Sequence, residues 1–479
     1  MGLKLSSAHE EKLVMHIQNS KVVDPTIWDK DHKHLLHPFT HFDSFKIEGS
    51  MIVTEASGCM IKDANGNEYL DGLGGMWCVN VGYGRNEIAE VMADQARQLA
   101  YANPFVDMTN APAAELAAKL AELAPENLNH VFFSLSGSCA NDTAVRIAHF
   151  YHARRGEPSR KHIISRYNSY HGSTYLTMSM GNREGDRTPN FHYLSDFIHH
   201  LSAPYPYRRP EGLTEDQFTD FLVDEFKTKI KQVGKENIAA FIAEPIQGSG
   251  GVVVPPKGYL KRMAAVAKEN GILFIADEVV TAFGRLGHWF ASKDVFDFEP
   301  DMIVCAKGLT SGYLPLGATL YSDEIHAAIS APGPDVWFAH GFTYSGHPVC
   351  CAVALKNIEI IEREDLLGNA AVVGDHFEQR LKELEHLPLV GQVRGKRLMQ
   401  CVEYVSNKET KAHLADDINI SKRISNVCEI NGLLVRPIGH LDVMSPPLTL
   451  SIKQADFIVD TLGNAIEEVA TNLRIEGLI

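Results

Sequence analysis

Short apolar runs alternate with amphipathic segments through the middle of the chain. Apolar residues recur at helical spacing in "NEIAEVMADQARQLA" (86–100) and "DTAVRIAHFYHARR" (142–155), as expected for helices with one buried face. Runs of a length typical of buried strands occur in "HVFFSL", "KHIIS", "IAAFIAEP", "GILFIADEV" and "MIVCA". This alternation predicts an α/β fold with a mostly parallel sheet between helices, whose ligands bind beyond the carboxyl ends of the strands.

The two ends of the chain have a different pattern. Apolar and polar residues alternate in "MIVTEASGCMIKDANGNEYLDG" around the turn dipeptide Asn65–Gly66, which predicts a small antiparallel unit. A long helical stretch begins near Val349, and short strands such as "LLVRP" follow it. We therefore expect an N-terminal segment that contributes to a small domain (1–80), a large domain (81–345) and a C-terminal small domain (346–479).

Composition narrows the class of protein. The 479 residues are 45% hydrophobic and 22% charged, which is ordinary for a soluble globular chain. Acidic residues outnumber basic ones by 60 to 45, the formal net charge is −15, and no long basic run occurs. Nucleic acid and anionic membranes are therefore not expected as partners.

Cysteines and targeting signals indicate the compartment. The 8 cysteines are scattered without C-x-x-C pairs, which favours reduced thiols in a cytoplasm. Four nearby histidines (His32, His34, His37 and His41) lack regular ligand spacing, so no metal site is expected. The myristoylation-like start with Gly2 lacks a second anchor, and no stretch has the length and apolarity of a membrane span. We expect an unprocessed cytoplasmic protein.

Opposite charges end two of the predicted strands. Asp277 closes "GILFIA" and Lys307 closes "MIVCA", a separation that accommodates one strand–helix–strand crossover. Parallel strands joined in this way bring both charges to the same edge of the sheet. A structural ion pair or two unrelated surface residues would have the same sequence pattern.

Two further strand ends add polar groups at that edge. "SLSGSCANDTAVRI" passes from a strand through Ser136–Gly137–Ser138 into a helix, whose free amides and dipole could bind a phosphate or could merely form an N-cap. "FIAEPIQGSGG" supplies Glu244 and Gln247 before a Gly-rich turn. The pattern predicts a phosphate cup, an amine, a carboxylate and an amide at one site.

Several motifs together resemble those of a known family. They are "SGSCANDT", "YNSYHGST", "AEPIQG", "FIADEVVTAFGRLG", "CAKGLTSGYLPLGA" and "HGFTYSGHPV". Over roughly residues 35–460 the chain resembles the class III (omega) aminotransferases, pyridoxal phosphate enzymes of fold type I. The resemblance implies a large domain with a mostly parallel, seven-stranded type of sheet between helices, and a smaller α+β domain.

The resemblance also implies a set of cofactor-binding residues. They are Gly137, Ser138, Tyr170, Glu244, Gln247, Asp277, Val279, Lys307 and Thr343. Lys307 would form the Schiff base with the aldehyde of pyridoxal 5′-phosphate, and Asp277 would pair with the pyridine nitrogen. These two are the expected catalytic residues, because an ionised carboxylate keeps that nitrogen protonated and a released lysine is a base.

The other implied roles concern the phosphate and the ring. Gly137 and Ser138 would hold the phosphate, joined by Thr343 from a second subunit. Tyr170 would stack on the pyridine and Val279 would pack on its other face. Gln247 would hydrogen-bond the phenolic oxygen. Cys139 stands where the family usually has Glu, a departure that could alter local capping or substrate preference.

The implied substrate-binding residues are Trp77, Phe105, Tyr170 and Arg436. Arg436 matches the family's mobile arginine, which grips the carboxylate of one substrate and swings away for the other. A surface ion pair is the alternative for Arg436. The aromatic residues would wall the pocket, with Phe105 belonging to the neighbouring subunit's site, or they would simply be core residues.

The expected function is transfer of an amino group to pyruvate, giving alanine. The donor would be an omega-amino acid, a diamine or polyamine, taurine or another primary amine. The expected assembly is a homodimer or dimer of dimers with shared active sites. The alternative is a decarboxylating aminotransferase or an aminomutase of the same fold, and a further alternative is a non-catalytic binding protein on this fold. A nucleotide-binding dehydrogenase is a weaker alternative, because the Gly-rich segments lack the full G-x-G-x-x-G spacing.

Overall fold

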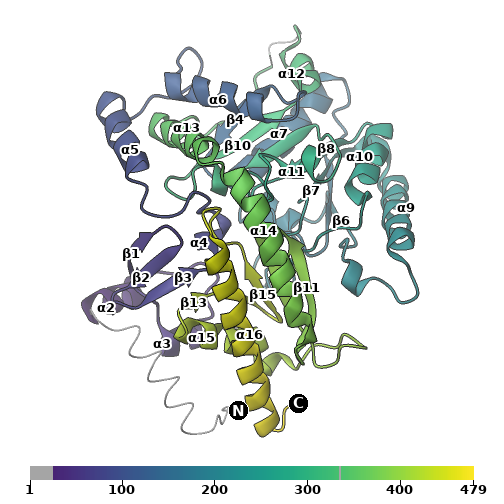
Figure 1. The fold of residues 1–479 in the computed structure, drawn as a ribbon. Coiled ribbons are helices and arrows are strands. Elements are labelled where there is room, and N and C mark those ends of the chain that lie inside the picture. Colours follow the sequence, from purple (N-terminus) through teal and green to yellow (C-terminus); the bar gives the residue numbers. More distant parts are fainter. Residues whose placement is uncertain (1–24, 334–335) are drawn as a thin grey trace.

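The computed structural model describes residues 25–333 and 336–479, and its centre is a seven-stranded sheet (Figure 1). Its strands, in spatial order, are β4 (His130–Ser134), β10 (Gly317–Tyr321), β9 (Met302–Cys305), β8 (Leu273–Asp277), β7 (Ile238–Ala243), β5 (His162–Arg166) and β6 (Ile198–Leu201). Strands β9, β8, β7, β5 and β6 run parallel, whereas β10 is antiparallel to both of its neighbours. The predicted α/β fold with a mostly parallel sheet is therefore confirmed.

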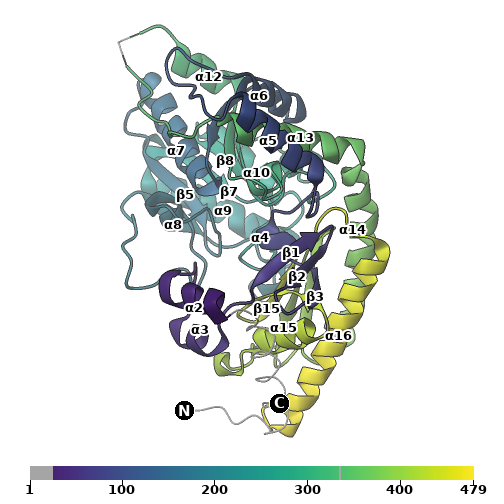
Figure 2. The same cartoon turned by 90° about the vertical axis from the view of Figure 1, so that its left-hand side faces the viewer.

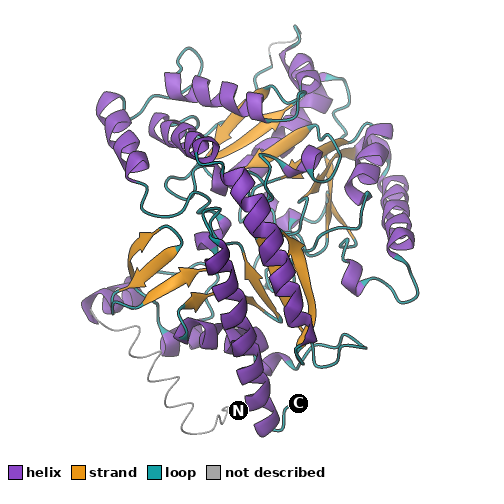
Figure 3. Cartoon of the chain, in the orientation of Figure 1, coloured by secondary structure: helices purple, strands orange, loops and turns teal. Residues whose placement is uncertain are grey.

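Helices cover both faces of this sheet (Figure 3). They include α7 (Gly137–Arg154) on one face, and α9 (Glu215–Val233) and α10 (Tyr259–Glu269) on the other. All residues of β7 are buried, and they are divided between two hydrophobic clusters. Ile242 packs with the residues of α7, whereas Phe241 packs with Phe226 of α9. A strand buried on both faces needs a continuous apolar run, which is what the sequence has there.

Two smaller sheets lie at the other end of the molecule. One has the order β1 (Val53–Ser57), β2 (Met60–Asp63), β3 (Glu68–Asp71) and β13 (Leu433–Leu434), and the other has the order β11 (Val390–Lys396), β12 (Met399–Tyr404), β15 (Leu441–Met444) and β14 (Arg436–Ile438). The antiparallel unit predicted around Asn65–Gly66 is β2 and β3. Because β13 pairs with β3, N-terminal and C-terminal segments share one sheet. The domain boundaries near residues 80 and 345 remain a proposal.

The remaining helices surround these sheets. They are α2 (Pro25–His34), α3 (Phe42–Glu48), α4 (Gly74–Trp77), α5 (Asn86–Gln98), α6 (Ala111–Leu123), α8 (Tyr175–Met180), α11 (Ala291–Asp294), α12 (Asp323–Ser330), α13 (Pro348–Arg363), α14 (Leu366–Lys382), α15 (Ile420–Ile430) and α16 (Ile452–Ile475). Helices α14 and α16 pack side by side, and α2 and α3 lie at the end with the smaller sheets (Figure 2). Within residues 25–333 and 336–479, no helix has the length and apolarity needed to cross a membrane.

Candidate active site

A cavity of about 490 Å³ lies at the carboxyl ends of the parallel strands. The residues predicted from the sequence that line it are Gly137, Ser138, Tyr170, Glu244, Asp277, Val279 and Lys307. They come from the ends of β4, β5, β7, β8 and β9 or from the segments that follow these strands. The pairing of Asp277 with Val304 places the end of β8 beside β9, so the two opposite charges share one cavity.

Lys307 follows β9 directly and begins a short 3₁₀ turn. Its φ angle is 47°, in the left-handed region that residues with a Cβ adopt at a cost and mainly where function requires it. Lys307 lines the cavity, and its amine has no hydrogen bond or ion pair within the described part of the chain. Burial lowers the pKa of Lys307 although the carboxylate of Asp277 opposes the shift, so a neutral amine is more accessible than in solution.

Asp277 is held by a network of buried side chains. Its Oδ2 accepts hydrogen bonds from Nδ1 of His171 and Nδ2 of Asn141, each at 2.8 Å. Asn141 also donates to the carbonyl of His171 at 2.8 Å, and the other ring nitrogen of His171 lies 3.2 Å from Ser165 Oγ. Oδ1 of Asp277 accepts only the amide of Val279, at 3.2 Å, within the described residues. One carboxylate oxygen is thus fixed and the other can still accept a strong hydrogen bond.

The turn into α7 forms a cup with free amides. Ser136 caps the helix through a hydrogen bond from the amide of Cys139, at 3.3 Å. The amides of Gly137 and Ser138 have no acceptor among the described residues, as expected for the first turn of a helix. A Cβ on Gly137 would lie 2.8 Å from Cγ2 of Val279, so glycine is required for this close approach. Free amides and the helix dipole together favour an anion here.

Glu244 and Tyr170 form another part of the wall. Glu244 is buried, and its two oxygens accept the amides of Tyr170 at 3.0 Å and Gly248 at 2.8 Å. Burial raises the pKa of Glu244, and the nearby carboxylate of Asp277 adds to this shift while His171 opposes it. The hydroxyl of Tyr170 lies 3.0 Å from Ser173 Oγ.

Gln247 and Trp77 do not line the cavity. Gln247 is fully buried and its Nε2 donates to the carbonyl of Tyr167 at 2.9 Å, while its Oε1 has no partner among the described residues. Trp77 is buried in a hydrophobic cluster with Met399 and Val443, and its ring lies next to Gly248. The direct roles of Gln247 at the cofactor and of Trp77 at the substrate therefore remain predictions.

Arg436 lies within electrostatic reach of the cavity. Nη1 of Arg436 donates to Sδ of Met76 at 2.8 Å. Burial lowers the pKa of Arg436, Arg183 lowers it further, and the neighbouring Tyr170 and Asp186 oppose the shift. The positive charge of Arg436 in turn contributes to the lowered pKa of Lys307. Arg436 has no carboxylate within ion-pair distance in the described residues, so its guanidinium is available to a ligand.

Thr343 and Phe105 lie on an exposed surface outside the cavity of their own chain. The carbonyl of Thr343 accepts a hydrogen bond from the hydroxyl of Tyr101 at 2.8 Å. The side chain of Phe105 is 45% exposed and its ring packs against Gly341, two residues before Thr343. Neither residue lines the cavity of its own chain, and their expected roles in the site of a second subunit remain predictions.

His171 and Asn141 are site residues that the sequence reasoning did not assign. Both occur in motifs quoted above, "YNSYHGST" and "SGSCANDT", directly after Tyr170 and three positions after Ser138. Position 141 lies about one helical turn after Gly137 in α7, so it faces the sheet again. This spacing is a signal for the contact between Asn141 and Asp277. No comparable local signal identifies His171, because its contact with Asp277 joins two segments that are far apart in the sequence.

Comparisons with known proteins agree with this geometry. The family model described as aminotransferase class-III matches residues 45–466. The putrescine–pyruvate aminotransferase of Pseudomonas aeruginosa is 40% identical over 459 residues, covering 95% of this chain and 98% of the relative. The diaminobutyrate–2-oxoglutarate transaminase of Halomonas elongata is 36% identical, with 94% and 98% covered.

A solved structure supports the same conclusion for the fold. The thermostable (S)-enantioselective omega-transaminase from Thermomicrobium roseum superposes with a TM-score of 0.90 at 41% identity. The match covers 94% of this chain and 100% of that one.

Proposed function

The chain belongs to the class III aminotransferase family, which depends on pyridoxal 5′-phosphate, and from this premise we propose that it transfers the amino group of a diamine or another omega-amine to pyruvate. The observation that supports this most directly is that an amine and a carboxylate from neighbouring parallel strands, Lys307 and Asp277, line one cavity. The P. aeruginosa relative, named for putrescine and pyruvate, supports this donor class and this acceptor.

The residues of the cavity fit the cofactor. The amides of Gly137 and Ser138, which have no acceptor among the described residues, would hold its phosphate. Oδ1 of Asp277, which accepts only the amide of Val279 among the described residues, would accept a hydrogen bond from the ring nitrogen, and Lys307 would carry the cofactor covalently. Tyr170 and Val279 line the cavity where the two faces of the ring would lie.

When bound, pyridoxal phosphate supplies an electron sink for the pair left on the substrate carbon after a proton is removed. Asp277 would keep a proton on the ring nitrogen, because an ionised carboxylate stabilises the cation and an amide does not. His171 and Asn141 orient that carboxylate from behind. Nζ of Lys307, with its lowered pKa, would take the proton from the amine-bearing carbon and return it at the other end of the transfer.

Arg436 would bind the carboxylate of the keto acid. A guanidinium forms two parallel hydrogen bonds with a carboxylate, and Arg436 has no competing carboxylate within ion-pair distance in residues 25–333 and 336–479. An amine donor without a carboxylate would not engage Arg436, so the side chain would have to move aside. Its contact with Met76, whose side chain is 54% exposed, is weak enough to allow such a movement.

We infer that the protein acts as a homodimer or a dimer of dimers with shared active sites. Exposed aromatic residues surround Thr343, and Tyr101, Phe105 and Tyr344 are 43%, 45% and 54% exposed. A second copy that covers them would bury apolar surface and bring Thr343 to the neighbouring phosphate site. All eight cysteines are free, which supports a reducing cytoplasm as the compartment.

A half-reaction screen tests the function. The cofactor-loaded protein is mixed in turn with putrescine, longer diamines, β-alanine and taurine, and the visible absorbance of the bound cofactor is followed before pyruvate is added. Loss of absorbance with a diamine and recovery with pyruvate, together with alanine formation, would support the proposal. Carbon dioxide release, or product formation without any keto acid, would instead identify a decarboxylating aminotransferase or an aminomutase.

Covalent attachment is tested separately. Borohydride reduction followed by peptide mass mapping should label the peptide that contains Lys307, and Lys307→Ala should abolish the label. A label elsewhere in the chain would overturn the assignment of Lys307.

A further inference from the structure

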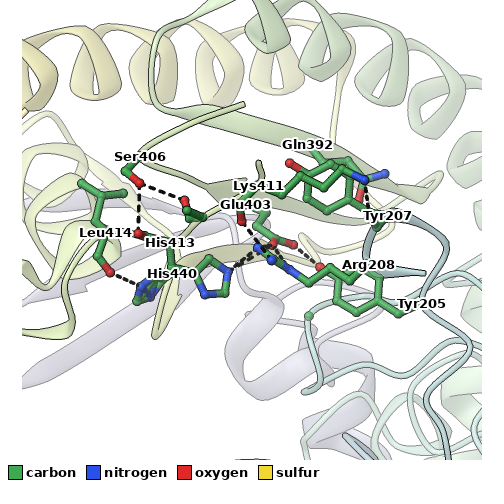
Figure 4. A network of polar contacts seen from close by, with 12 residues as sticks. Tyr205, Tyr207, Arg208, Gln392, Glu403, Ser406, Lys411, His413, Leu414 and His440 are labelled. Atoms are coloured by element: carbon green, nitrogen blue, oxygen red, sulfur yellow. Dashed lines mark hydrogen bonds and ion pairs between the residues drawn. The ribbon is translucent and has the colours of Figure 1, made fainter. Parts of the chain in front are cut away.

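A buried carboxylate, Glu403, joins two parts of the molecule behind the cavity. Glu403 lies in β12 and its side chain is 1% exposed. Oε1 accepts a hydrogen bond from Nε of Arg208 at 2.8 Å and lies 3.3 Å from Nε2 of His413. Oε2 accepts hydrogen bonds from the hydroxyl of Tyr205 and from Nη1 of Arg394, the latter at 2.5 Å. Figure 4 shows Glu403 among Tyr205, Arg208 and His413. Tyr205 and Arg208 follow β6 of the large sheet, so Glu403 connects the two sheets.

The same segment after β6 is held by a second set of contacts. Nζ of Lys411 donates to the carbonyl of Tyr207 at 2.8 Å and lies 4.8 Å from the centre of the Tyr207 ring. Nη1 of Arg208 donates to the carbonyl of Lys411 at 3.0 Å. Figure 4 shows these side chains together with Glu403 in one network of polar contacts. The contacts fix the small sheet against the large one.

Arg394 connects Glu403 to the wall of the cavity. It lies in β11, and its Nε donates to the carbonyl of Gly251 at 2.7 Å while Nη1 binds Glu403. Gly251 has a φ angle of 102°, and a Cβ there would lie 2.8 Å from Nη2 of Arg394. Only glycine leaves room for the guanidinium to pack on this loop.

The loop that Arg394 holds is the one that carries cavity residues. The amides of Gly251 and Val252 donate to the carbonyl of Gly248, and the amide of Gly248 donates to Oε2 of Glu244 at 2.8 Å. Glu244, Ile246 and Ser249 line the cavity. A movement of Gly251 would therefore be transmitted to Glu244 through two hydrogen bonds, one between Gly251 and Gly248 and one between Gly248 and Glu244.

The sheet that carries Glu403 also carries Arg436. The strand order is β11, β12, β15 and β14, and Val443 of β15 pairs with Cys401 on one side and Arg436 on the other. A shift of this sheet relative to the large one would displace Arg436 and the loop around Glu244 together. Buried ionic networks have a well-defined geometry only while every member is present.

We propose that Glu403 and Arg394 are positioning residues for the substrate cavity, which set the places of Glu244 and Arg436 without touching substrate or cofactor. The expected change in the KM for pyruvate rests on the proposed function. The expected change in hydrogen exchange of the loop does not depend on it. Removing the charge of Glu403 leaves the buried Arg394 without an acid, so the loop at residues 247–253 should open more often.

The test uses the cofactor-loaded full chain and compares Glu403→Gln with the wild type. Hydrogen exchange in the peptide that spans residues 244–253 should become about fivefold faster or more. The KM for pyruvate should rise about tenfold with kcat changed less than about threefold, because positioning of the carboxylate grip is lost while Lys307 and Asp277 are intact. Arg394→Lys should act in the same direction, because one ammonium cannot replace both the contact with Glu403 and the contact with Gly251.

Glu476→Gln is the matched control. Glu476 forms a partly buried ion pair with Arg423 of α15, with both oxygens within 3.0 Å of Nη1, and the structure of residues 25–333 and 336–479 contains no hydrogen bond or ion pair between Glu476 and residues 244–253. It should lower the melting temperature without changing exchange at residues 244–253 or the KM. Equal exchange in Glu403→Gln and wild type, or equally faster exchange in Glu476→Gln, would overturn the proposal. If Glu403→Gln does not fold, the same measurements on Arg394→Lys test the proposal instead.

Failure of the proposed function has a different signature. A wild-type protein that reacts with no amine would refute the function, while the exchange of residues 244–253 would still decide whether Glu403 positions the loop. Normal wild-type turnover with unchanged exchange and KM in both variants would refute only the positioning role.

Discussion

Asp442 should make the stability of the protein strongly pH-dependent. It lies in the middle of β15, fully buried, and its only hydrogen bond in the described structure comes from the hydroxyl of Tyr404 to Oδ2 at 2.8 Å, while Oδ1 has no partner there. Burial raises the pKa of Asp442 from 3.8 to about 8, and the donor Tyr404 offsets only part of this shift.

The sign and size of the effect follow from linkage. Between about pH 4 and pH 8 the folded protein binds a proton at Asp442 that the unfolded chain does not bind, so the free energy of unfolding falls as pH rises through this window. The slope from this one group is about 1.4 kcal/mol per pH unit, and the effect between pH 6 and pH 8 is about 2 kcal/mol. Above about pH 9 the difference should level off.

Asp442→Asn removes this proton linkage with little change in shape. Urea unfolding of wild type and variant is followed by tryptophan fluorescence at pH 6, 7, 8 and 9 at a fixed protein concentration. The variant should gain stability relative to wild type as pH rises, and Asp417→Asn, at an exposed position in the 3₁₀ turn before α15, should show no such trend. A constant difference between Asp442→Asn and wild type across this range would show that Asp442 is already ionised when folded, and would refute the reasoning.

Three further predictions concern the active site. Asp277→Asn should lower kcat about a hundredfold or more while the cofactor stays bound, measured by single-turnover kinetics and absorbance; unchanged kcat would exclude the role of its charge. Arg436→Lys should raise the KM for pyruvate about tenfold and leave the KM for a diamine unchanged, since a lysine lacks the planar fork; an equal effect on both substrates would contradict a carboxylate-specific grip. Removal of pyridoxal phosphate should lower the melting temperature, since free cofactor at about 100 times its dissociation constant stabilises the folded state by about 2.7 kcal/mol; identical melting of apo and loaded protein would contradict binding at this cavity.

The sheet and its edge could be predicted because the signals are local. Strands such as β7 and β8 are buried on both faces, so each is a continuous apolar run in the sequence. Strand β10 was not predicted. Its sequence "GATLY" is a short run in a glycine-rich segment, and its antiparallel direction is set by pairing with β4, which lies far away in the chain. Such pairings depend on tertiary contacts that no window of sequence contains.

The site, like the fold, has parts that local sequence predicts and parts that depend on tertiary contacts. Lys307 and Asp277 could be predicted to share a cavity because parallel strands end on the same edge. The direction of Gln247 could not be predicted, since it depends on the bridge between residues 247 and 253, which turns the amide towards Tyr167. The contact between His171 and Asp277 likewise depends on the path of the chain after β5.

The segment around Lys307 explains why a lysine is tolerated at the end of a buried strand. A Cβ on Gly308 would lie 2.4 Å from Nδ2 of Asn80, so the chain turns sharply there against a fixed amide. Asn357 donates to the carbonyls of Gly308 and Leu309 at 2.8 and 3.1 Å, which satisfies the backbone of the turn. The surroundings therefore fix the backbone, while the amine of Lys307 has no hydrogen bond or ion pair with any residue that the structure describes. A strained backbone beside a buried polar group that lacks a partner is typical of a binding site, because a bound ligand supplies the missing partner.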